Sequence, residues 1–291
     1  MASNWTRWTY TYREIEHMEL LLENLPLLIL MVIAGVSGGA LAGMLGVGGG
    51  IIYVPALDVV FSLVGIETDI SMHVAVATSL AIIIPTSISS ALAHRKRDSV
   101  DMDLVRLWGS TILLGSISGV IAASQLEGSS LSFGFGMLTL LVAINMLLPI
   151  PQINFFMRFS SPSLGFILPF GLGSFSSMLG VGGGTFSVPI LTMLGRPIHR
   201  AVGTAAAFGL LISLPGAVSF AVSGWGDGRL PIASLGYVNL IALSIMAPVT
   251  ALTAPIGASA AHRLGQRQLR LVFGFCLFAI CIRMILKTFL N

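Results

Sequence analysis

Long apolar runs follow one another along almost the whole chain and are separated by short polar breaks. The pattern predicts ten helical segments, with approximate bounds 25–46, 51–65, 71–93, 103–124, 130–149, 163–180, 185–195, 199–223, 233–260 and 267–289. Apolar stretches of about 18 residues or more are typical of helices that cross a bilayer. We therefore expect an all-α polytopic membrane protein.

The composition agrees with this expectation. Of 291 residues, 55% are hydrophobic and 9% are charged, whereas soluble domains carry about 25% charged residues. The net charge of +3 comes from Lys and Arg in short loops, so no nucleic-acid partner is expected. Cys276 and Cys281 lie in one apolar run and are expected to be buried apolar side chains. We expect no metal and no cofactor.

The chain divides into four parts. Residues 1–24 form an N-terminal extension that mixes aromatic and charged residues and lacks the pattern of a signal peptide. Residues 25–149 form a first repeat, 150–162 a polar and aromatic linker, and 163–290 a second repeat.

The evidence for repeats is a set of matching motifs. MLGVGGG occurs at 44–50 and again at 178–184, and AVATS at 75–79 corresponds to AVGTA at 201–205. Each half is therefore predicted to contain five equivalent segments in the same order.

The positive residues predict how the two halves face the membrane. They gather after the third segment, in the linker, and before the eighth and tenth segments, as Arg95, Lys96, Arg97, Arg106, Arg158, Arg196, Arg200, Arg263, Arg267 and Arg270. Loops on the cytoplasmic side carry such an excess. Corresponding loops of the two halves then lie on opposite sides, so we expect inverted five-segment repeats in the inner (cytoplasmic) membrane.

The two GVGGG stretches are predicted to be the tips of re-entrant hairpins. The segments after them, 51–65 and 185–195, are short, since eleven residues of helix span roughly 16 Å of a core about 30 Å thick. Each is therefore predicted to be a half-helix, with its glycine tip near the midplane of the bilayer. Inverted repeats with broken helices around a central site are typical of secondary transporters.

Two such tips can bind an anion without a buried Lys or Arg. Half-helix N-termini present free N–H groups and a partial positive charge, and glycine permits positive φ and close approach of a ligand. Hydroxyls in the stretches after the tips can add hydrogen bonds. The predicted substrate-binding residues are Gly46, Gly48, Gly49, Gly50, Thr78, Ser79, Gly180, Gly182, Gly183, Gly184 and Thr204.

Helix packing is the alternative explanation for a glycine in a membrane helix. It suits the glycines at helical spacing, Gly35, Gly38, Gly39, Gly43, Gly165, Gly171 and Gly173. A GVGGG run instead removes helix propensity altogether. A nucleotide-binding loop would need a soluble strand before it, and the flanks here are apolar helices.

These motifs resemble a known family. GMLGVGGGIIYVPAL and SMLGVGGGTFSVPIL are similar to the duplicated signature of the sulfite exporter TauE/SafE family, over residues 25–290. The resemblance implies transport of sulfite or of organosulfonates such as sulfoacetate across the bacterial inner membrane. The family stretch Gly-Thr-Ser is Ala77-Thr78-Ser79 in one half and Gly203-Thr204-Ala205 in the other, so the second half lacks one hydroxyl.

The sequence therefore predicts a secondary transporter, an exporter of a small sulfur oxyanion or organosulfonate, and not an enzyme. The alternatives are a membrane scaffold or assembly protein and a transporter of another anion, such as a carboxylate. An intramembrane hydrolase using Ser174, Ser176 or Ser177 would need a nearby base, and the GxSxG motif is absent. Expected partners are the small anion and the lipid bilayer. A proton, carried by His73 or His199, is a candidate coupling ion, and a second copy of the chain is a candidate partner.

Overall fold

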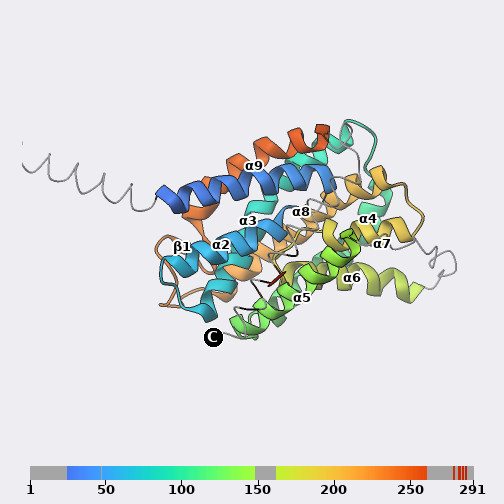
Figure 1. The fold of residues 1–291 in the computed structure, drawn as a ribbon. Helices are drawn as coiled ribbons and strands as arrows, with labels where there is room; N and C mark the ends of the chain where they lie inside the picture. Colours follow the sequence, from blue (N-terminus) through green and yellow to red (C-terminus); the bar gives the residue numbers. More distant parts are fainter. Residues whose placement is uncertain are drawn as a thin grey trace, which may run out of the picture.

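The computed structural model describes residues 25–46, 48–147 and 162–260, with 278, 281, 282, 284 and 286. These residues form an elongated helical bundle (Figure 1). In this part of the chain, five helices are long and apolar enough to cross a membrane: Leu25–Leu45, Thr68–Arg95 (α3), Met102–Ala123 (α4), His199–Ser223 within α8 (Ile198–Ser223), and Leu240–Ala260 (α9). The expectation of a multi-pass, all-α membrane protein is confirmed at this level.

Four shorter helices complete the described bundle. They are α2 (Gly50–Leu63), α5 (Gly128–Leu147), α6 (Pro162–Met178) and α7 (Gly184–Met193). With 14 residues in α2 and 10 in α7, the helices after the glycine tips are as short as predicted. The N-terminal extension, the linker up to residue 161 and the tenth predicted segment, apart from five single residues, lie outside the described residues.

The prediction of a continuous helix over 233–260 was wrong at its start. Ser234–Leu235 (β1) and Val238–Asn239 (β2) pair as a short antiparallel hairpin, and α9 begins only at Leu240. Gly236 forms the turn with φ +53°, against the Ala221 carbonyl. The side chain of Asn239 accepts a hydrogen bond from the Ala242 N–H at 2.9 Å and so caps the helix. This polar cap was not recognised inside an otherwise apolar run.

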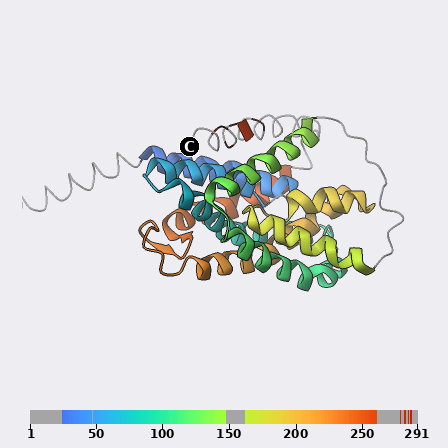
Figure 2. The ribbon, with the colours of Figure 1, turned by 90° about the horizontal axis from the view of Figure 1, so that it is seen from below.

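Helices α3 and α8 pack against each other at the centre of the bundle. Of the five long helices α3 is the most enclosed, with 72% of its most apolar window buried. Helix Leu25–Leu45 lies along α9 (Figure 1), and α6 lies along α4 (Figure 2). Each outer pair therefore joins the first helix of one predicted repeat to the fourth helix of the other.

Small residues make these outer contacts close, and the contacts are reciprocal. Gly257 of α9 packs on the carbonyl of Ala40, and its counterpart Gly119 of α4 packs on the carbonyl of Ser174. Such exchange of equivalent contacts is what a two-fold relation between halves produces. The packing role predicted for Gly39 and Gly43 is confirmed by their contacts with α9, and that of Gly173 by its contacts with α4.

Two of the predicted packing glycines do not pack. A Cβ built on Gly165 or Gly171 would meet no atom within 4 Å. Both lie on α6. Helical spacing alone could not show that these two positions have no close neighbour among the described residues.

Candidate functional site

The two glycine tips meet each other. A Cβ built on Gly48 would lie 2.7 Å from the Cα of Gly182, and one on Gly50 would collide with the Gly180 carbonyl. The backbones of the two hairpins are therefore in direct contact, which only residues without side chains allow.

The meeting point lies near the middle of the two central helices. Gly48 and Gly50 both contact Ile83, midway along α3, whereas Gly183 packs against Phe208, Gly209 and Ile212, midway along α8.

Each tip also rests on the central helix of the other half. Gly46 packs against the carbonyl of Val202 in α8, and its counterpart Gly180 packs against Val76 in α3. The two valines occupy equivalent positions in AVGTA and AVATS. These two packing contacts position both hairpins, so residues of both halves meet at the candidate site.

The backbone conformation of the tips agrees with the glycine argument at four positions. The φ angle is +66° at Gly46, +77° at Gly48, +75° at Gly49 and +67° at Gly180. Gly183, in contrast, has an ordinary right-handed φ of −52°. The first tip therefore depends on positive φ more than the second does just before its half-helix.

Of the three predicted hydroxyls, only Ser79 touches a tip. Its Oγ donates to the Gly180 carbonyl at 2.8 Å, in a fully buried position. This hydrogen bond joins the first half to the tip of the second. Ser79 has no hydroxyl counterpart, because Ala205 takes the equivalent position.

Thr78 and Thr204 instead face helix starts in the opposite half. Thr78 Oγ1 accepts from the Asn239 N–H at 2.9 Å, and Thr204 Oγ1 accepts from the Asp101 N–H at 2.9 Å. Asp101 caps α4 through Leu104 and forms an ion pair with Arg196 at 3.1 Å. Both threonines therefore accept hydrogen bonds from backbone groups at the starts of α9 and α4.

A narrow cavity lies beside the first tip. It is lined by Ala42, Gly46, Gly48, Thr86, Ser87, Ser90 and Ala206, and it is too tight to admit a water molecule. None of these lining residues is charged. Sequence reasoning missed the three hydroxyls of α3, although their spacing from Ser79 places them further along the same helix. An apolar helix with scattered serines gives no signal of which ones face a cavity.

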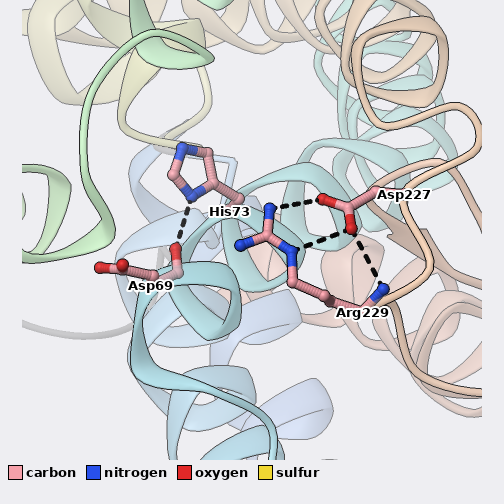
Figure 3. Close-up of polar contacts among 4 residues, drawn as sticks. All are labelled: Asp69, His73, Asp227 and Arg229. Atoms are coloured by element: carbon pink, nitrogen blue, oxygen red, sulfur yellow. Dashed lines mark hydrogen bonds and ion pairs between the residues drawn. The ribbon is translucent and has the colours of Figure 1, made fainter.

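The histidines proposed as proton carriers lie away from this cavity. His73 is buried near the start of α3, with Nδ1 2.8 Å from the Asp69 carbonyl (Figure 3) and Nε2 3.1 Å from the Ala123 carbonyl. Its ring lies 5.3 Å from that of Tyr237. His199 is exposed near the start of α8.

An exposed ion pair lies in the loop between α8 and β1. Arg229 bonds to the Asp227 carboxylate at 2.8 Å, as Figure 3 shows, and this hydrogen bond lowers the pKa of Asp227. Exposed pairs of this kind contribute little to stability. We therefore infer that the ion pair helps to set the local conformation of the loop.

Comparison with known proteins gives one consistent result. A "probable membrane transporter protein" of Haemophilus influenzae is 33% identical over 260 residues, which cover 89% of this chain and 98% of that protein. One of Methanocaldococcus jannaschii is 27% identical over 276 residues, or 92% of this chain and 99% of that protein. One of Bacillus subtilis is 32% identical over 122 residues, 41% of this chain and 44% of that protein. No solved structure matches the chain.

The family comparison covers most of the chain. The model of the sulfite exporter TauE/SafE family matches residues 31–284, which include both glycine tips and both central helices. Together with the apolar helices, this match makes the protein a multi-pass membrane transporter. The chain belongs to the sulfite exporter TauE/SafE family.

Proposed function

We propose that the protein exports a small sulfur oxyanion or organosulfonate, such as sulfite or sulfoacetate, across the cytoplasmic membrane as a secondary transporter. The observation that carries the proposal is the contact of Gly48 with Gly182, midway along α3 and α8. Two half-helices begin there, at Gly50 and Gly184, and their N-termini supply N–H donors and partial positive charge to one place.

The proposal includes inverted repeats. Reciprocal packing of Gly119 and Gly257 supports two equivalent halves, and the basic loop at Arg95–Arg97 and the start of α8 at Arg200 support the orientation by charge. In this arrangement the first hairpin enters from the outside and the second from the cytoplasm.

Transport then requires the tips to separate. The tip backbones touch and the cavity beside the first tip admits no water, so an anion could reach the proposed site only after the tips move apart. Rocking one half against the other would open the anion site to one side at a time, as in other transporters built from repeats.

Binding and transport assays test this function. Purified protein in lipid nanodiscs is titrated with sulfite, sulfoacetate, methanesulfonate, sulfate, taurine and acetate, and proteoliposomes are assayed for uptake of the best binder. We expect the sulfur anions to bind and to move across the bilayer. Binding of none of these anions would favour the scaffold alternative, and a preference for acetate would point to a carboxylate transporter.

A further inference from the structure

Several buried serines have no hydrogen-bond partner among the described residues. They are Ser87, Ser90, Ser132, Ser176 and Ser213. Each is at most 2% exposed. A buried hydroxyl that makes no hydrogen bond is unfavourable and calls for an explanation. Ser132 lies on α5, and the other four belong to the helices that hold the tips.

The first pair lies in the cavity beside the first tip. Ser87 and Ser90 line it together with Gly46 and Gly48. Ser87 also reaches toward α8, since a Cβ on Gly209 would lie 2.5 Å from its Oγ. The neighbouring Thr86 differs, because its hydroxyl is paired with that of Thr250 at 2.7 Å. Ser87 and Ser90 are thus the side chains of this cavity whose hydroxyls make no hydrogen bond among the described residues.

The second pair occupies the corresponding places at the second tip. In the aligned repeats, Ser213 is the counterpart of Ser87, and Ser176 is the counterpart of the cavity residue Ala42. Both serines are fully buried and unpaired in the part of the chain that the structure describes. Unpaired hydroxyls therefore occur at corresponding places beside both tips.

The side chain of Leu80 lies at the position beside the second tip that corresponds to the cavity beside the first. Gly216 corresponds to Ser90 and Leu80 to Ala206, and Cδ1 of Leu80 lies 2.9 Å from where a Cβ of Gly216 would be. At the second tip, Leu80 therefore fills the space that corresponds to the cavity beside Ala206 at the first tip. The surroundings of the two tips therefore differ, with a narrow cavity beside the first and the Leu80 side chain at the corresponding place beside the second.

We propose that Ser87 and Ser90 bind the substrate anion on one side of the tips and that Ser176 and Ser213 bind it on the other. This inference rests on the proposed function. Anion oxygens accept hydrogen bonds from hydroxyls, so entry of the substrate would satisfy the groups that are unpaired in the described conformation. With the predicted orientation, the first pair serves the cytoplasmic half of the path and the second pair the outer half.

Alanine substitutions test the assignment, with Ser132→Ala as the matched control. Loss of an unpaired hydroxyl leaves no new orphan partner, so Ser87→Ala, Ser90→Ala and Ser213→Ala should fold with unchanged or higher Tm. Their affinity for methanesulfonate should fall roughly 10- to 100-fold, the effect of one hydrogen bond to a charged group. Ser132→Ala, equally buried and unpaired, should bind as the unsubstituted protein does.

The outcomes separate this proposal from the proposed function. If the unsubstituted protein binds and transports a sulfonate while the three variants match Ser132→Ala, the serine assignment is wrong and the transporter function stands. If the unsubstituted protein binds no small anion, the proposed function fails first.

Cysteine accessibility tests the two sides. In intact cells and inverted vesicles, Ser90→Cys should react with an impermeant thiol reagent from the cytoplasm, and Ser213→Cys from the outside. Methanesulfonate should slow both reactions, and the unsubstituted chain reports the background of Cys276 and Cys281. Reaction of both from one side, or of neither, would overturn the two-sided path.

Discussion

Gly49 combines a left-handed backbone with close contacts inside the first half. Its φ is +75°, and a Cβ there would lie 2.7 Å from the Gly38 carbonyl and would also meet the Tyr53 ring. Gly49→Ala adds left-handed strain of about 1–2 kcal/mol to this clash, so we expect anion binding to be lost. Gly183→Ala, with ordinary φ and contacts no closer than 3.1 Å, should be milder. Titration by calorimetry checks both.

The control for the tips is a glycine that meets nothing. Gly165→Ala lies on open helix surface and should leave binding unchanged, whereas Gly39→Ala would clash with α9 and would not isolate the tip effect. Equal loss of binding in Gly49→Ala and Gly165→Ala would mean that tip geometry is not what the anion requires.

Thr78 and Thr204 combine a structural role with the proposed binding role. Valine at either position removes the acceptor for a backbone N–H, that of Asn239 or of Asp101. The free energy of unfolding should fall by about 1–3 kcal/mol, and anion binding should weaken with it. Thr78→Ser and Thr204→Ser should restore both. Thermal unfolding and binding measured together would contradict this account if valine lowered affinity without lowering stability.

At the level of elements, apolar length and glycine placement predicted most of the helices. The short α2 and α7 followed from the spacing between the GVGGG runs and the next polar loops, which is a local property of the sequence. The β-hairpin before α9 was not predicted, because its residues are nearly as apolar as those of the predicted membrane helices. Its start is decided by the Asn239 cap and by the contact of Gly236 with α8, which is a tertiary interaction.

Orientation is the prediction at this scale. Lys96 follows α3 and Trp225 follows α8, so they are near-equivalent positions in the two halves, and both are exposed. Inversion places Lys96 in the cytoplasm and Trp225 outside. Cysteine at Lys96 should be labelled only in inverted vesicles, and cysteine at Trp225 only in intact cells. Labelling of both in the same preparation would mean that the halves are not inverted.

For the whole molecule, the matching motifs predict that both halves build one site. The contacts of Gly46 with Val202 and of Gly180 with Val76 show that each tip packs on the central helix of the other half. The sequence could not show that the tips touch or that their surroundings differ. Those features depend on how Leu80 and Ala206, equivalent in the alignment, fill the space beside opposite tips. Such packing is decided by the assembled bundle and not by any single segment.

Charge selectivity is the prediction that belongs to the whole transporter. The residues lining the cavity are uncharged, so in the proposed site the anion's charge would be balanced by helix N-termini and hydroxyls. Removing a divalent ion from water costs far more than removing a monovalent one, and partial charges cannot offset that difference. Methanesulfonate or bisulfite should therefore bind more tightly than sulfate. Arg200→Gln removes an exposed charge at the start of α8 and should change the rate and its salt dependence while leaving affinity intact. Arg196 is a poorer choice for this test because it is paired with Asp101. If sulfate bound best, or if Arg200→Gln abolished equilibrium binding, a full positive charge would have to take part, and the anion site would lie at the cytoplasmic surface instead of at the glycine tips.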